Sequence, residues 1–198
     1  MICKFMASFG FISVAVFGNY LQGGEHIKYF SFITFALMFG FCGDVFLGIK
    51  EIAPTFKKKL IPIGLVYFLI GHIFYLFAFS SVSGFEPRTL IALPAVGVVG
   101  FVLIKLFRMN LGGALHTVCS VYYGMLAWKI AMCIYLVVKD ACSANILALI
   151  GSCLFMVSDT CLAFVYFARV KKKNALVTAE LSTYYTAQLL LAMSVAIR

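Results

Sequence analysis

Two aspartates lie within apolar stretches of the sequence that are long enough to cross a lipid bilayer. Asp44 falls inside residues 29–49, and Asp159 falls inside residues 142–168. Placing a charged carboxylate at the centre of a bilayer costs roughly 3 kcal/mol on insertion scales, so such residues usually serve a function. Desolvation favours the neutral form of a carboxyl group, which can then act as a general acid. With a second carboxyl group as base, such a pair can hydrolyse an acid-labile bond.

The composition is that of a membrane protein. The chain is 64% apolar with a mean hydropathy of +1.06, which excludes an ordinary soluble domain of 198 residues. An apolar stretch of about 20 residues crosses the hydrocarbon core as a helix. We therefore predict one all-α integral membrane domain over residues 1–198, built as a bundle of about seven transmembrane helices. The seven apolar stretches are 3–21, 29–49, 60–82, 89–107, 117–138, 142–168 and 176–196.

The net charge is +9, and the basic residues are distributed as expected for a membrane protein rather than for a nucleic-acid-binding protein. If the loops between the helices are numbered 1 to 6, most basic residues lie near the N-terminus and in or beside loops 2, 4 and 6. These residues are Lys4, Lys50, Lys57, Lys58, Lys59, Lys105, Arg108, Arg169, Lys171, Lys172 and Lys173. Basic residues favour the cytosolic side, so we expect the N-terminus and these loops in the cytosol. There they can contact anionic lipid head groups.

This topology places the remaining polar residues in the cytosolic half of the membrane or near its middle. From the helical rise, Asp44 lies about 9 Å and Asp159 about 15 Å from the cytosolic ends of their helices. His72 lies near the middle of the third stretch, with Tyr75 one turn further on the same face. Polar groups in lipid must face the bundle interior, so we predict one pocket open toward the cytosol or the cytosolic leaflet. Its other members are Tyr122, Tyr123, Ser158, Tyr184, Tyr185 and Gln188.

Each of these residues also has a purely structural interpretation. His72 and Gln188 could join helices by hydrogen bonds, and tyrosine is common near membrane interfaces. Ser158 could bond back to its own helix. Lys129, inside the fifth stretch, is expected to extend its amino group toward the membrane surface. The two aspartates could also serve only to join helices, but their insertion cost favours a function.

A zinc hydrolase is a competing interpretation of the same residues. Zinc hydrolases typically use three protein ligands, and of the three histidines only His72 lies deep in a predicted helix. His26 falls in loop 1 and His116 at the cytosolic start of the fifth stretch. A site of His72, Asp44 and Asp159 is conceivable. The chain has no G-x-S-x-G motif of a serine hydrolase, and its seven scattered cysteines form no C-x-x-C pair, which predicts free thiols.

Several motifs, taken together and in order, resemble those of the YhhN-like lysoplasmalogenases, multi-pass membrane hydrolases of bacteria and eukaryotes. The matching segments are residues 43–44, 71–75, 122–123, 158–163 and 182–190. The Ser-Asp pair at 158–159 followed by Tyr-Tyr-x-Ala-Gln at 184–188 is the most specific part. The resemblance extends from about residue 29 to the end of the chain. Family members usually have eight spans, so the additional one would precede the first stretch found here.

The resemblance implies hydrolysis of the vinyl ether bond of 1-alkenyl lysophospholipids without a metal or other cofactor. The products are a fatty aldehyde and glycerophosphoethanolamine or glycerophosphocholine, and the implied location is the endoplasmic reticulum membrane. We expect Asp44 and Asp159 to act as acid and base, in an order that the sequence leaves open, and His72 to orient water or a carboxylate. The residues expected to bind the lysophospholipid are Tyr75, Tyr122, Tyr123, Ser158, Tyr184, Tyr185 and Gln188.

Two other functions remain open from the sequence. A zinc-dependent lipid amidase similar to the alkaline ceramidases would fit seven helices but needs more deep histidines than His72. A small proton-coupled transporter could use intramembrane aspartate and histidine as a proton relay. Transporters usually contain repeated halves with broken helices, whereas the motifs around Asp44 and Asp159 do not lie in matching halves. The sequence gives no indication of the oligomeric state or the preferred head group.

Overall fold

The chain forms an all-α bundle in a computed structural model that describes residues 2–52, 54–106, 113–168 and 173–198. Within these ranges there is no strand, and two short 3-10 turns, Pro54–Phe56 and Pro87–Ile91, precede α3 and α4. The helices lie close to the seven predicted stretches, so the predicted fold class is confirmed. They are α1 (Ile2–Leu21), α2 (Ile27–Ile52), α3 (Lys57–Ser83), α4 (Ala92–Leu106), α5 (Gly113–Lys139), α6 (Ser143–Phe167) and α7 (Lys173–Ala196).

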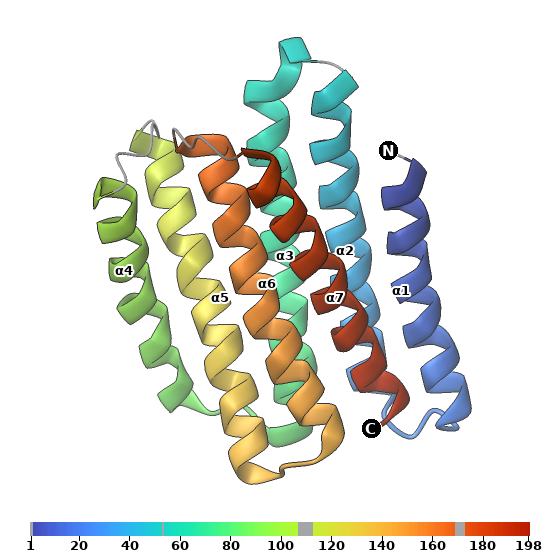
Figure 1. The fold of residues 1–198 in the computed structure, drawn as a ribbon. Coiled ribbons are helices and arrows are strands. Elements are labelled where there is room, and N and C mark those ends of the chain that lie inside the picture. The colour runs from blue at the N-terminus through green and yellow to red at the C-terminus, as the bar shows by residue number, and fades with distance from the viewer. Residues whose placement is uncertain (1, 53, 107–112, 169–172) are drawn as a thin grey trace.

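Successive helices run in opposite directions along the bundle (Figure 1). The start of α1 lies at the same end as the last turns of α2, α4 and α6 and the first turns of α3, α5 and α7. We call this the N-terminal end of the bundle. The C-terminus and the junctions of α1 with α2, α3 with α4, and α5 with α6 lie at the opposite end. The alternation expected from the charges is therefore present in the fold, although the basic residues Arg108, Arg169, Lys171 and Lys172 lie outside the described residues.

The helices pack around a centre that is filled by side chains. α2 packs along α3 and α6 along α7, while α5 contacts both α3 and α6. α1 packs on α2 and α7, and α4 packs on α5, so these two helices lie at opposite edges of the bundle (Figure 1). Across the centre, α3 meets α6 through large rings, because the ring centroids of His72 and Phe155 are 4.7 Å apart and those of Phe68 and Phe155 are 6.4 Å apart.

Four of the described helices are long and apolar enough to cross a membrane, which makes the chain a membrane protein. These helices are α2, α3, α5 and α6. α1 contributes a shorter apolar segment, Phe5–Leu21. Large apolar side chains are exposed on the remaining helices too, for example Phe9 on α1, Val98 on α4 and Leu189 on α7. Because the seven helices run side by side (Figure 1) and large apolar side chains are exposed on α1, α4 and α7 as well, seven spans remain our prediction.

Two glycines allow neighbouring helices to approach closely. A Cβ atom on Gly18 would lie 2.5 Å from the Cβ atom of Ala196, so a larger residue would force α1 away from α7. A Cβ atom on Gly124 would lie 2.8 Å from the carbonyl oxygen of Leu93, at the contact of α5 with α4. These contacts hold the edge helices against the five that surround the centre.

Candidate functional site

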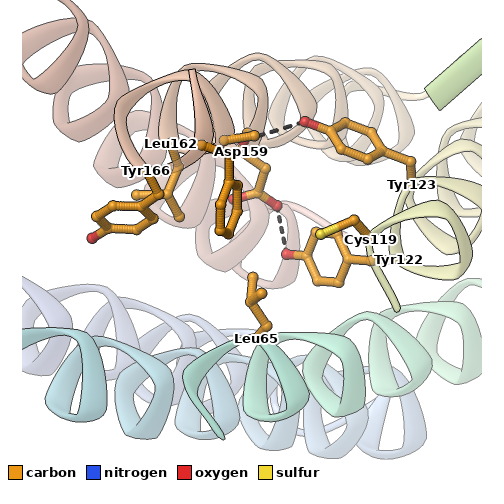
Figure 2. A pocket seen from close by; sticks show the side chains of 9 residues that line it. Leu65, Cys119, Tyr122, Tyr123, Asp159, Leu162 and Tyr166 are labelled. Carbon is orange, nitrogen blue, oxygen red and sulfur yellow. Dashed lines mark hydrogen bonds between the residues drawn. The ribbon is translucent and has the colours of Figure 1, made fainter. Parts of the chain in front are cut away.

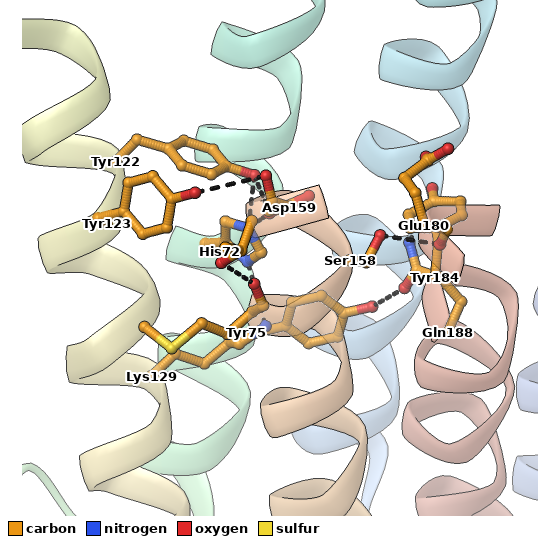
Figure 3. Close-up of polar contacts among 12 residues, drawn as sticks. His72, Tyr75, Tyr122, Tyr123, Lys129, Ser158, Asp159, Glu180, Tyr184 and Gln188 are labelled. Carbon is orange, nitrogen blue, oxygen red and sulfur yellow. Dashed lines mark hydrogen bonds and ion pairs between the residues drawn. The ribbon is translucent and has the colours of Figure 1, made fainter. Parts of the chain in front are cut away.

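Polar side chains from α3, α5, α6 and α7 meet inside the bundle (Figure 3), and Asp44 of α2 joins them by a hydrogen bond with Tyr184. They come from five helices, as the sequence predicts, and most of the predicted site residues are among them. The predicted residues that are buried are Asp44, His72, Tyr75, Tyr122, Ser158, Asp159, Tyr184 and Gln188. In a membrane, such groups must find partners within the protein, and all of them except Ser158 do so here in two hydrogen-bonded chains.

The first chain, which we call the Asp159 chain, runs from α5 to α3, returns to α5 and ends on α6. Tyr122 donates its hydroxyl to Asp159 Oδ2 at 2.6 Å. His72 Nε2 lies 3.1 Å from the Tyr122 hydroxyl oxygen and 3.8 Å from Asp159 Oδ2. The other ring nitrogen, His72 Nδ1, lies 3.3 Å from Lys129 Nζ. Four side chains from three helices thus form a continuous polar path that ends at a carboxyl group.

Lys129 does not extend toward the membrane surface, so this prediction was wrong. Its side chain is fully buried, and its Nζ atom lies 4.4 Å from the ring centroid of Phe155 and 5.1 Å from that of Tyr75. The reason is its depth, because ten residues, or about 15 Å of helix, separate it from the nearer end of α5 at Lys139. Depth within an apolar stretch, the feature that distinguishes the two aspartates, is shared by Lys129 and was the signal of its burial.

The second chain, which we call the Asp44 chain, joins α3, α7, α2 and α1. Tyr75 donates its hydroxyl to Gln188 Oε1 at 2.6 Å, and Gln188 Nε2 donates to the Tyr184 hydroxyl at 3.1 Å. Tyr184 in turn donates to Asp44 Oδ2 at 2.8 Å. Ser8 donates to the same oxygen at 3.1 Å.

Ser8 is a member of the Asp44 chain that the sequence reasoning missed. It is buried on the face of α1 that also buries Phe11 and Ala15. This spacing of three and seven residues marks one side of a helix. A polar residue on the buried side of an apolar helix was therefore the signal that could have identified it.

The two chains begin next to each other and end at different carboxyl groups. Tyr75 and His72 lie one turn apart on α3, with ring centroids 6.3 Å apart, and Lys129 lies beside both. From there one chain leads to Asp159 and the other to Asp44. Each carboxyl group thus has its own hydroxyl donors, which separates the two aspartates into different local environments.

Three predicted binding residues lie outside these two chains. Ser158 donates to the backbone carbonyl of Glu180 at 3.1 Å, so it joins α6 to α7 rather than bonding to its own helix. Tyr123 donates to the backbone carbonyl of Asp159 at 3.4 Å, close to the limit of a hydrogen bond. The hydroxyl of Tyr185 is buried and has no hydrogen-bond partner among the described residues.

A small pocket of about 30 Å³ lies directly against Asp159 (Figure 2). Its volume is sufficient for a water molecule. Its position on α3, α5 and α6 is on the side of Asp159 that faces the N-terminal end of the bundle, the end expected in the cytosol. The pocket is mostly apolar, and its walls are Leu65, Cys119, Tyr122, Tyr123, Asp159, Leu162, Ala163, Tyr166 and Phe167.

The residues of the site give no support to the zinc site considered from the sequence. Both ring nitrogens of His72 are engaged, one with Lys129 and one with Tyr122, and Asp44 accepts hydrogen bonds from hydroxyl groups. Over residues 2–52, 54–106, 113–168 and 173–198, no group of three histidine, cysteine, aspartate or glutamate side chains is placed to hold a metal ion.

A comparison with known protein families finds a match over almost the entire chain. The sequence model of the YhhN family matches residues 1–195. The matched range contains every residue of the Asp159 chain, the Asp44 chain and the pocket. No solved structure matches the chain.

Proposed function

The chain belongs to the YhhN family, and we propose that it hydrolyses the vinyl ether bond of 1-alkenyl lysophospholipids. The observation that carries this proposal is the position of Asp159. Its buried carboxyl group accepts a short hydrogen bond from Tyr122 and also forms part of the wall of a water-sized, mostly apolar pocket. A carboxyl group, room for water and apolar walls are the three features that hydrolysis of a lipid vinyl ether requires.

The reaction consumes one water and needs only proton transfers. A proton adds to the alkenyl carbon that is not bonded to oxygen, and this gives an oxocarbenium ion. Water adds to the carbon next to the ether oxygen and loses a proton, which forms a hemiacetal. The bond between the hemiacetal carbon and the glycerol oxygen then breaks. The hemiacetal hydroxyl loses its proton to give the fatty aldehyde, and the glycerol oxygen receives a proton. No net proton is gained or lost, so a pair of carboxyl groups can serve as acid and base.

We assign Asp159 to the reacting atoms because it forms part of the pocket wall. A group that transfers a proton must come within hydrogen-bond distance of the atom it serves. Asp44 is the second carboxyl group of the bundle interior and is held by Ser8 and Tyr184. In this proposal His72 and Tyr122 orient the Asp159 carboxyl group. Asp44 is not part of the pocket wall, so it can serve as the second acid–base group only if substrate binding extends the pocket toward it.

The lipid chain needs more room than the pocket provides. An alkenyl chain is far larger than the roughly 30 Å³ beside Asp159. Binding therefore requires side chains of the pocket wall to move, and Leu65 of α3 and Tyr166 near the end of α6 are among them (Figure 2). We infer that the substrate reaches Asp159 between α3, α5 and α6 from the N-terminal end of the bundle.

The test is release of fatty aldehyde from 1-alkenyl lysophosphatidylethanolamine by the purified chain in detergent, with and without a metal chelator. We expect release in both conditions, and a loss of about a hundredfold or more in Asp159→Asn and in Asp44→Asn. Asp140→Asn is the matched control, because Asp140 is exposed between α5 and α6 at the opposite end of the bundle. Full activity of both folded interior variants would contradict the proposal. Loss of aldehyde release on chelation would place the chemistry on a metal ion at His72.

A proton-coupled transporter is the second candidate, and the Asp159 chain is the observation in its favour. Hydrogen-bonded aspartate, tyrosine and histidine side chains can pass protons through a membrane protein. Reconstituted vesicles with a pH-sensitive dye inside distinguish the two functions. Proton movement that depends on Asp159, without aldehyde release from the lysophospholipid, would favour transport.

A further inference from the structure

We propose that Lys129 is a positioning residue that fixes the tautomer of His72 and thereby directs the hydroxyl proton of Tyr122 onto Asp159. The catalytic consequence of this inference rests on the proposed function. The tautomer itself does not, and it can be measured without substrate.

Lys129 lies in the interior of the bundle, beside His72. Its side chain is fully buried, and its Nζ atom contacts His72 Nδ1 and the faces of Phe155 and Tyr75. Burying an amino group is costly unless partners compensate. The hydrogen bond to His72 and the two aromatic faces provide that compensation. The contact with His72 is therefore the polar anchor of this side chain.

Each hydrogen bond of the Asp159 chain has a defined direction. A lysine ammonium group donates three hydrogen bonds and accepts none. His72 Nδ1, 3.3 Å from Lys129 Nζ, must therefore carry no proton. In a neutral imidazole the proton is then on Nε2, which donates to the Tyr122 oxygen at 3.1 Å. Tyr122 consequently donates its own proton to Asp159 Oδ2 at 2.6 Å. All three bonds point toward the carboxyl group.

The other tautomer of His72 would change this arrangement. With the proton on Nδ1, His72 Nε2 would be an acceptor and would compete with Asp159 for the single hydroxyl proton of Tyr122. Asp159 would then lose its shortest donor whenever Tyr122 turned toward His72. Lys129, which lies against His72 Nδ1 and is not one of the pocket-lining residues, thus decides which neighbour receives that proton.

The experiment compares three variants of the full-length chain in detergent. Lys129→Met removes the donor but keeps a long apolar side chain among Phe155 and Tyr75, so it is expected to fold. Lys129→Arg keeps a cation that can only donate. Lys139→Met makes the same change near the exposed end of α5, where Lys139 Nζ donates to the Ser83 carbonyl, and serves as the control. Circular dichroism and thermal unfolding report the fold of each variant.

The deciding measurement is the ¹⁵N NMR spectrum of the imidazole nitrogens. The chain contains three histidines, so the His72 signals can be assigned with a His72→Gln variant. We expect unprotonated Nδ1 and protonated Nε2 in the unmodified chain, in Lys139→Met and in Lys129→Arg. In Lys129→Met we expect the form with protonated Nδ1 to appear. In the same variant kcat should fall about tenfold to a hundredfold, the size usual for loss of an orienting partner, with KM within about twofold.

Two results would overturn the inference. One is a His72 spectrum in Lys129→Met that is identical to that of the unmodified chain. The other is unchanged kcat in a folded Lys129→Met protein whose tautomer has shifted. Failure of the proposed function would be recognised separately, because the unmodified chain would then release no aldehyde.

Discussion

At the scale of single residues, the site is defined by where hydroxyl protons point. Tyr122 and Tyr123 are neighbours on α5 and both reach Asp159, but they contact different parts of it. Tyr122 donates to the carboxyl oxygen at 2.6 Å, whereas Tyr123 donates to the backbone carbonyl at 3.4 Å. Charge-assisted bonds to a carboxylate are shorter and stronger than bonds to a neutral carbonyl. The first tyrosine therefore bears on the chemistry and the second on packing.

Tyr122→Phe is predicted to lower kcat for vinyl ether hydrolysis by about tenfold to a hundredfold. The change removes the hydroxyl that links His72 to Asp159 and leaves the ring in place. Tyr123→Phe should change kcat by no more than about threefold, because the bond it removes is long. Steady-state kinetics of the two proteins, measured side by side, check the prediction. Equal losses in both would show that the tyrosines act through packing alone.

At the scale of helices, the edge helix α1 contributes to the site through its contact with α7. α1 carries Ser8, which donates to Asp44, and α7 carries Tyr184, which donates to the same oxygen. The two helices meet closely where Gly18 faces Ala196. The packing of α1 against α2 and α7 therefore helps to bring Ser8 within hydrogen-bond distance of Asp44.

Gly18→Ala is predicted to destabilise the bundle by about 1–3 kcal/mol, because the new methyl group would overlap Ala196. Gly10→Ala, on the same helix, is the control, since its Cβ atom meets nothing within 4 Å. Alanine there should be neutral or stabilising by up to about 1 kcal/mol through helix propensity. Thermal unfolding in detergent checks both changes, and similar melting temperatures for the two variants would contradict the prediction.

Ala163→Phe is predicted to obstruct substrate binding, because Ala163 belongs to the wall of the small pocket on α6. We expect kcat/KM to fall by about tenfold or more, since small displacements of a reacting group have large effects on rate. Val157→Phe enlarges an outward-facing residue of the same helix, which is 50% exposed, and should leave kcat/KM unchanged. A normal rate in Ala163→Phe would show that the substrate reaches Asp159 by another path.

At the scale of the whole molecule, the direction of the helices places the two ends of the chain on opposite faces of the bundle (Figure 1). The candidate pocket lies on the side of Asp159 that faces the N-terminal end. From the positive-inside bias we predict that this end lies in the cytosol. A lysophospholipid in the cytosolic leaflet would then have the shortest route to Asp159.

Epitope tags on the two termini are predicted to differ in accessibility. After permeabilisation of the plasma membrane alone, antibodies should reach an N-terminal tag but not a C-terminal tag. Both tags should react after full permeabilisation. The reverse pattern would place the pocket on the luminal side, and equal accessibility of the two tags would contradict seven spans.

Much of this architecture could be predicted from the sequence because it depends on distance along a helix. The length of an apolar stretch determines whether a helix can cross the membrane, and the helical rise gives each polar residue its depth. On that basis Asp44, His72 and Asp159 were expected at similar levels, on helices that converge, and they lie inside one bundle.

The tertiary structure alone decided which of these residues meet. Asp44 and Asp159 belong to separate hydrogen-bonded chains. Ser8 is a member of the Asp44 chain, and Lys129 is a member of the Asp159 chain. Ser158 contacts the backbone of α7 instead of the site. The physical reason is that side-chain contacts across the bundle depend on how each helix is rotated and which helices are neighbours. Both are set by packing between segments far apart in the chain, and depth along a single helix carries no information about them.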